Sequence, residues 1–217
     1  MIDMVDDVTG GEVRGARRAR EVVAGAVALG RRFHFEEPHA LQVARLSERL
    51  LDALADHYDL DARDREILAA AAILHDIGQR IAYKRHHKHS YYLISESDLP
   101  GLDLDEVELV ANVARYHRRA DPSTKHPPFE SLSEEDRDRV TRLSAILRVA
   151  DALDREHVQS VHDIAIGIDG RRMEIELEGE GDFELERWAL DRKKGLFEET
   201  FGLEIVVASE AVQNEST

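Results

Sequence analysis

The chain has 217 residues and a formal net charge of −16, with 45 acidic side chains against 29 basic ones. Such an acidic surface repels nucleic-acid phosphate, so the composition argues against a DNA or RNA partner. Cysteine is absent, which excludes disulfides and thiolate zinc sites and leaves imidazole and carboxylate as metal ligands. No apolar run has membrane-spanning length and no secretory signal is recognisable, so we expect a cytoplasmic protein with no membrane partner.

Most of the chain is predicted to be helical. Apolar residues at helical spacing predict helices over residues 13–29, 38–58, 62–75, 90–97, 104–119 and 134–153. Asp61, Asp103 and Ser133 each stand where a side chain can cap the helix that follows. Residues 79–88, which are basic, and residues 121–132, which are rich in proline, are expected loops.

The pattern changes towards the C-terminus. Residues 163–169 and 173–178 alternate apolar and polar side chains around the hairpin signal Asp169-Gly170. Helical spacing returns over 183–201, and a last strand is expected over 203–207. We therefore predict a mainly α fold with a flexible N-terminus (1–12), a helical domain (13–158), a small ββαβ appendage (159–208) and a flexible tail (209–217).

Four side chains stand out among the aspartates and the eleven histidines. His75 and Asp76 follow directly on an apolar helix, and His39 lies at the start of another helix. Asp151 lies inside the apolar helical segment LRVADALDR, where a buried carboxylate needs a cation to offset its lost hydration. Each residue alone is ordinary in a core or on a surface. Together they predict a site for one or two divalent metal ions, with Mn, Fe, Mg, Zn and Ni all compatible.

Several short motifs carry a more specific resemblance. They are LHDIG at 74–78, RHHKHSYYLI at 85–94, SDLPG at 97–101, RYHRR at 115–119 and LRVADALDR at 147–155. The chain resembles the HD superfamily of metal-dependent phosphohydrolases over residues 14–208. It is most similar to the C-terminal HD-type region of the Ppx/GppA family, which contains exopolyphosphatases and guanosine pentaphosphate phosphohydrolases. The resemblance implies an HD-domain helical bundle in which His39, His75, Asp76 and Asp151 hold the metal and His75 and Asp76 are catalytic.

One departure from that family bears on activity. In the family, the phosphatase reaction belongs to an N-terminal pair of actin-like domains, and no segment here resembles them or a GxxxxGK[ST] phosphate loop. We therefore do not expect the exopolyphosphatase activity of the family. In some members the HD motif is eroded, whereas all four ligand positions are intact here, which favours an operating metal site.

A second metal ion is compatible with two further histidines. His89 and His117 are the candidates, and Asp76 would then bridge two ions about 3.5–4 Å apart. The alternative is that both histidines bind substrate phosphate or the loop backbone. We expect His86 and His87 to contact phosphate or to lie in an exposed loop. The remaining histidines, assigned to packing or to the surface, are His34, His57, His126, His157 and His162.

A basic cluster flanks these histidines in an otherwise acidic chain. Guanidinium and ammonium groups beside a metal bind phosphate oxygens, whereas a solvated loop paired with carboxylates is the alternative. Arg155, one helical turn after Asp151, is expected either to orient that carboxylate or to pair with other acids. The residues that we expect to bind a substrate anion are Arg80, Lys84, Arg118 and Arg119.

These features predict a metal-dependent phosphohydrolase that acts on a nucleotide or another phosphate ester or anhydride through a metal-activated water. The alternative is a non-catalytic Ppx/GppA-like module that binds a phosphorylated ligand, polyphosphate or nucleotide, or a partner actin-like phosphatase chain. A purely structural helical protein is the third possibility. The N-terminal helix and the appendage offer surfaces for a homodimer.

Overall fold

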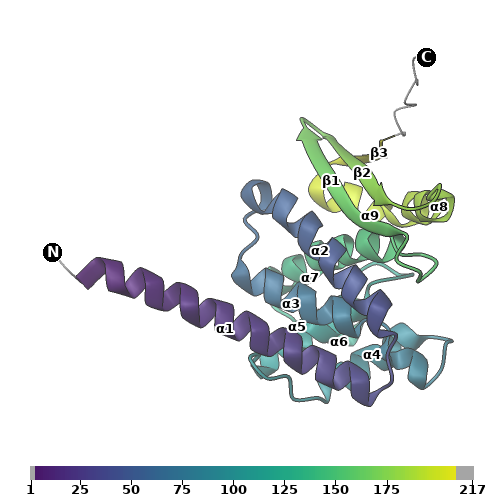
Figure 1. Cartoon of the computed structure of the whole chain (residues 1–217). Helices are drawn as coiled ribbons and strands as arrows, with labels where there is room; N and C mark the ends of the chain where they lie inside the picture. Colours follow the sequence, from purple (N-terminus) through teal and green to yellow (C-terminus); the bar gives the residue numbers. More distant parts are fainter. Residues whose placement is uncertain (1–2, 209–217) are drawn as a thin grey trace.

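The computed structural model describes residues 3–208, with side chains described from Arg14 onward. It confirms the predicted mainly α architecture with a small C-terminal sheet (Figure 1). In chain order the elements are α1 (Asp3–Arg32), α2 (Glu37–Tyr58), α3 (Ala62–Leu74), the 3-10 helix η1 (Ile77–Arg80), α4 (His86–Ser95), α5 (Leu104–Arg115), α6 (Pro127–Glu130), α7 (Glu134–Ala152), β1 (Val161–Asp169), β2 (Arg172–Gly179), α8 (Glu184–Lys193), α9 (Gly195–Phe201) and β3 (Glu204–Val207).

Helix α3 lies at the centre of the helical body. It packs against α1, α2, α5 and α7, and its segment from Ile67 to Leu74 is buried apart from Ala69. A helix that is apolar all round is stable only where other elements enclose it, which is the case here. Because α3 is enclosed, His75 and Asp76 at its C-terminal end lie inside the body rather than at its surface.

Helix α1 differs from its prediction at both ends. It begins at Asp3 rather than at residue 13, and Figure 1 shows its N-terminal half projecting from the body. Gly30 does not end the helix. A Cβ on Gly30 would lie 2.8 Å from the Phe35 ring, so glycine is needed there for close packing. His34, with φ of +53°, lies at the turn into α2 instead. The predicted tail, 209–217, lies outside the described residues.

Other boundaries also differ from the prediction. Helix α4 begins at His86 rather than near Ser90, and α5 ends at Arg115 rather than near Arg119. The proline-rich loop contains the short helix α6. The predicted helix over 183–201 is two helices, divided at Lys194 just before Gly195, a residue of low helical propensity.

The appendage is a three-stranded sheet covered by two helices. Strands β1 and β2 form the predicted antiparallel hairpin, with Gly170 at φ +56° in its turn, and β3 pairs with β2 in parallel. Met173 and Ile175 of β2 and Phe197 of α9 are buried. Contacts of β1 with α2, and of α8 and α9 with α7, place α8 beside the C-terminal end of α7.

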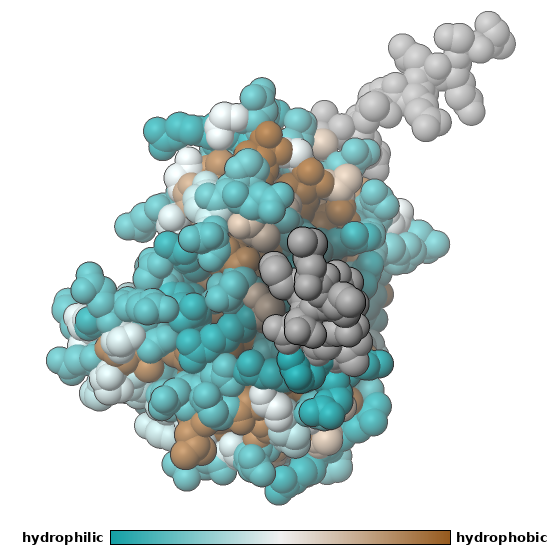
Figure 2. Space-filling model, turned by 90° about the vertical axis from the view of Figure 1, so that its left-hand side faces the viewer, coloured by the Kyte–Doolittle hydropathy of each residue, from teal (hydrophilic) through white to brown (hydrophobic). Residues whose placement is uncertain are grey.

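The outer surface agrees with the acidic composition. Figure 2 shows a face that is mostly hydrophilic, with apolar side chains in separate patches. Among the helices that the structure describes, none combines the length and apolar character needed to cross a membrane.

Candidate metal centre

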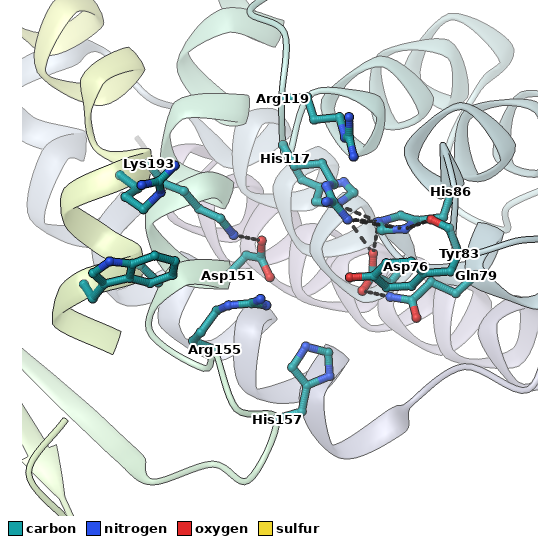
Figure 3. Close-up of a pocket in the computed structure, with 14 residues that line it drawn as sticks. Asp76, Gln79, Tyr83, His86, His117, Arg119, Asp151, Arg155, His157 and Lys193 are labelled. Atoms are coloured by element: carbon teal, nitrogen blue, oxygen red, sulfur yellow. Dashed lines mark hydrogen bonds and ion pairs between the residues drawn. The ribbon is translucent and has the colours of Figure 1, made fainter. Parts of the chain in front are cut away.

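A cavity of about 410 Å³ lies between the ends of α3, α5 and α7 on one side and α8 on the other. Asp76, His117 and Asp151 are at its inner end, and Figure 3 shows Lys193 of α8 reaching Asp151. Three buried helix ends and one helix of the appendage therefore converge on one space, which is where the titratable side chains collect.

The first group of ligand-type atoms joins His39, His75 and Asp151. The Nε2 atoms of His39 and His75 lie 3.7 Å and 3.8 Å from Oδ1 of Asp151. Nε2 of His75 also lies 3.6 Å from Oδ2 of Asp76. These residues come from the start of α2, the end of α3 and the last turn of α7, and their atoms are close enough to surround one cation.

The second group joins Asp76, His86 and His117. Oδ1 of Asp76 lies 2.9 Å from Nε2 of His86 and 3.4 Å from Nε2 of His117 (Figure 3). The two imidazole Nε2 atoms are 3.3 Å apart. Asp76 therefore faces the first group with one carboxylate oxygen and the second group with the other. A carboxylate in that position can bridge two metal ions.

Hydrogen bonds fix the orientation of all four imidazoles. Nδ1 of His75, His86 and His117 donates to the backbone carbonyl three residues earlier, at 2.7, 3.0 and 2.7 Å respectively. Nδ1 of His39 donates to Oδ2 of Asp154 at 2.8 Å. In each ring the lone pair is therefore on Nε2, which faces the carboxylates. Histidine ligands of metals have this arrangement, with the second nitrogen bonded to a carbonyl or carboxylate.

Two of these nitrogens lack a partner. Within the described residues, the buried Nε2 atoms of His39 and His75 make no hydrogen bond. A buried polar atom without a partner carries a desolvation cost that a bound cation removes. Nitrogen and oxygen donors at these positions suit a divalent cation, and so the residues present fit the metal that the sequence predicts.

The electrostatics favour the metal-binding protonation states of Asp76, His75 and His117, but not that of His39. Burial raises the pKa of Asp76, but the neighbouring His75, His86 and His117 lower it well below its ordinary value. Burial lowers the pKa of His75 and, more strongly, that of His117. Burial opposes protonation of His39 too, yet the hydrogen bond to Asp154 and the nearby carboxylates raise its pKa. Ionised carboxylates and neutral imidazoles are the ligating forms.

The structure brings five of the six predicted metal ligands together. His39, His75, Asp76, Asp151 and His117 all belong to the two groups, whereas His89 belongs to neither. The imidazole beside Asp76 is instead that of His86, which the sequence placed in contact with phosphate or in an exposed loop. Because α4 begins at His86, the buried positions of this helix are 86, 90, 91 and 94, and residue 89 is only partly buried.

His157, which the sequence assigned to packing or to the surface, also lies at the site. Its ring stacks on that of His39 with centroids 3.6 Å apart, and it has ligand-type atoms close to those of His39 and Asp76. Its Nδ1 donates to Glu36 at 2.7 Å. A positive φ of +60° places it there after α7 ends. No sequence periodicity signals such a loop position.

The glycine after the His75–Asp76 pair is required by a close approach. A Cβ on Gly78 would lie 2.2 Å from the carbonyl oxygen of His86. The Gly78 N–H also donates to the buried Oγ of Ser90 at 3.0 Å. Gly78 therefore lets α4 pack directly on η1, which places His86 beside Asp76.

The predicted anion-binding residues divide into two pairs. Arg118 and Arg119 line the cavity. Lys84 is exposed and does not line it, and Arg80 is exposed on a smaller neighbouring pocket that also reaches Asp76. The sequence missed the four cavity residues of the appendage, which are Trp188, Ala189, Arg192 and Lys193. Arg155, foreseen beside Asp151, also lines the cavity.

A buried arginine holds the segment that carries His117, Arg118 and Arg119. Nε of Arg148 donates to the carbonyl of Tyr116 at 2.7 Å. Its Nη atoms donate to the Ala120 carbonyl at 2.7 Å and to Oδ1 of Asp121 at 2.6 Å. The segment turns through Arg119 at φ +66°. Arg148 is 6% exposed, so these bonds replace nearly all of its hydration.

The fold and the site together define a mainly α domain with a buried histidine–aspartate cluster suited to divalent cations. The chain belongs to the Ppx/GppA phosphatase family, because the family model described as "Ppx/GppA phosphatase, domain III" matches residues 22–196. This match confirms the predicted relationship to the Ppx/GppA family, and it covers most of the body and part of the appendage.

Two curated relatives are similar to part of the chain. A guanosine-5'-triphosphate,3'-diphosphate pyrophosphatase of Pseudoalteromonas translucida is 34% identical over 88 residues, which is 40% of this chain and 18% of the relative. The protein of the same name from Photobacterium profundum is 32% identical over 112 residues, 52% of this chain and 22% of the relative. The matched part is therefore about a fifth of the length of each relative.

Proposed function

We propose that the chain is an HD-type metal-dependent phosphohydrolase that acts on a nucleotide or another phosphate ester or anhydride. The observation that carries the proposal is the pair of ligand groups sharing Asp76 at the inner end of a cavity with basic walls. The names of the relatives, pyrophosphatases of a guanosine nucleotide, support this substrate class.

Each group of ligands would hold one cation. His39, His75 and Asp151 would hold the first, His86 and His117 the second, and Asp76 would serve both. A divalent cation bound there lowers the pKa of its water towards neutrality and supplies hydroxide at the site. His75 and Asp76, predicted as catalytic residues, would then act through the metal that they bind.

The basic side chains of the cavity would bind the substrate anion. Arg118 and Arg119 lie in the segment after α5, Arg155 follows α7, and Lys193 comes from α8. Their charges reach the cavity from different sides, so they can contact several phosphoryl oxygens together and stabilise the negative charge that develops in hydrolysis. The contribution of Arg80 and Lys84 would be limited to attracting the anion from solvent.

One observation favours the non-catalytic alternative. The matched part is about a fifth of each relative, and the resemblance assigns the reaction of the family to other domains. In this alternative the cavity binds a phosphorylated ligand, polyphosphate or nucleotide, or the chain pairs with an actin-like phosphatase. The metal would then stabilise the domain or sense a ligand.

A panel of nucleotides, tripolyphosphate and simple phosphate esters, offered with Mn²⁺ or Mg²⁺, separates these functions. We expect metal-dependent release of phosphate or pyrophosphate that Asp76→Ala abolishes. Asp56→Ala, which changes an exposed aspartate on α2, is the matched control and is expected to retain the wild-type rate. Metal content of the purified protein is measured alongside.

The outcomes point to different conclusions. Metal and ligand binding without turnover of any compound would favour the non-catalytic module. A protein that binds none of the five candidate metals and no phosphorylated ligand, and whose stability is insensitive to chelators, would favour the purely structural possibility.

A further inference from the structure

The single tryptophan of the chain lies on the wall of the candidate active-site cavity. Trp188 belongs to α8 and lines the cavity together with Asp76 and Asp151, yet 55% of its surface is exposed. Exposed single apolar side chains are ordinary. An indole in a cavity whose basic side chains suit phosphate is a more specific feature. Phosphate has no apolar or planar group that an indole could contact.

A second flat group accompanies the indole. Arg192, four residues later on α8, places its guanidinium carbon 5.1 Å from the centroid of the Trp188 ring and lines the same cavity. Indole rings and guanidinium planes are the side chains on which nucleobases stack. The pair thus presents two stacking surfaces at the appendage side of the cavity, across from the imidazoles of the body.

Another exposed apolar residue of α8 provides the contrast. Leu185 is 47% exposed, about as much as Trp188, but it does not line the cavity. It lines a shallow surface pocket on the outside of α8, which Trp188 also borders. Of these two exposed apolar side chains of α8, Trp188 alone therefore reaches the cavity, where it lies beside Arg192.

We propose that Trp188 and Arg192 form a stacking platform for the base of a nucleoside phosphate whose phosphates lie at the metal centre. This inference rests on the proposed function and narrows its substrate class. A nucleotide uses both the basic walls and the platform, whereas tripolyphosphate, which has no planar apolar group, uses the basic walls alone. The platform therefore favours nucleotides over inorganic polyphosphate.

Because Trp188 is the only tryptophan, its fluorescence reports on the platform without labelling. The full chain is titrated with guanosine 5'-(β,γ-imido)triphosphate and, separately, with tripolyphosphate, and nucleotide absorbance is corrected with free tryptophan amide. We expect saturable quenching by the nucleotide analogue and little change with tripolyphosphate. Equal responses to the two compounds would overturn the platform.

Kinetics of variants provide the second test. Trp188→Ala is expected to lower kcat/KM for the nucleotide about tenfold more than for tripolyphosphate, which corresponds to the loss of one stacking contact. Trp188→Phe, which keeps a flat ring, is expected to recover most of the difference. Leu185→Ala is the matched control on the same helix and is expected to leave both rates unchanged.

Failure of the platform and failure of the proposed function have different signatures. Hydrolysis of both compounds with equal losses in Trp188→Ala would overturn the platform and leave the phosphohydrolase. Absence of turnover together with saturable quenching by the nucleotide analogue alone would support the platform in a non-catalytic module. A concentration-dependent emission shift without ligand would show a second copy covering Trp188 and would overturn the proposal.

Discussion

Lys193 on α8 pairs its ammonium with Oδ2 of Asp151, while Oδ1 of the same carboxylate faces His39 and His75. Burial raises the pKa of Asp151, but the Lys193 charge and neighbouring histidines outweigh it and hold that pKa far below the ordinary range. One oxygen of Asp151 therefore faces the ammonium of Lys193, and the other faces the candidate metal position.

This pairing predicts opposite effects of Lys193→Met on stability and on metal affinity. Without metal, the variant leaves Asp151 without its cation and should lose about 2 kcal/mol of unfolding free energy, less than a fully buried pair because the lysine side chain is 25% exposed. With the competing charge removed, Mn²⁺ should bind about threefold or more tightly.

Urea unfolding in a chelator and calorimetric titration with Mn²⁺ measure the two quantities. Lys194→Met is the control, because the neighbouring lysine pairs with Asp191 and Glu198 instead. Weaker binding of Mn²⁺ by Lys193→Met would contradict the interpretation, since it would make Lys193 a support of the metal position.

The ligands of the second group can be tested by counting bound metal. His86→Gln should lower the bound Mn²⁺ from about two ions per chain to one, because it removes the nitrogen 2.9 Å from Oδ1 of Asp76. His89→Gln, a change on the same helix, should leave the count as it is. Elemental analysis after dialysis gives the number directly. A loss of metal in His89→Gln but not in His86→Gln would show that His89 is the metal ligand, as the sequence predicts.

Arg148→Met should destabilise the protein by about 3 kcal/mol, because the carbonyls of Tyr116 and Ala120 lose a buried charged donor. It should also raise KM more than it lowers kcat, since Arg148 holds the segment that carries Arg118 and Arg119. Thermal unfolding and steady-state kinetics check the two parts. Arg137→Met, on the same helix at a more exposed position, is the control, and Arg148→Lys should be intermediate.

His87 predicts a dependence of stability on pH. Burial, His86 and nearby arginines lower its pKa to about 4. Between that value and the unfolded value of about 6.5, the unfolded chain takes up a proton here that the folded chain does not. This histidine therefore destabilises the protein as the pH falls through that window. Below it, both states are protonated and the loss is complete.

Urea unfolding of metal-free protein at about pH 7 and about pH 5 measures the effect. His87→Gln should lose less stability between the two pH values than the wild type. His89→Gln controls for loss of a histidine from α4. An unchanged pH dependence in His87→Gln would show that other groups account for it.

The site residues that the sequence predicted correctly lie on helices with a clear apolar pattern or a clear start signal. His75 and Asp76 follow an apolar run that is buried on every side, and Asp151 lies in the equally apolar end of α7. His39 stands one residue after Pro38, which fixes the start of α2. These four side chains come together because their helices pack against one another. Their positions do not depend on the conformation of a loop.

The residues that it missed depend on other information. His86 depends on the exact start of α4, where Arg85 adopts φ of +65°. His157 lies in a turn, and Lys193 reaches Asp151 only because α8 packs against α7. Boundaries and long-range packing are the least visible features of a single sequence. The uncertain start of α4 is also the reason that the sequence predicted His89, and not His86, beside Asp76.

The division of the cavity between body and appendage has a consequence for how such a protein diversifies. The groups suited to chemistry come from α2 to α7, whereas α8 supplies Trp188, Arg192 and Lys193. Under the proposed function, substitutions at Trp188 and Arg192 would change which molecules the cavity accepts while leaving the imidazole cluster intact. Descendants of a common ancestor can acquire new preferences by remodelling that helix and its immediate surroundings alone.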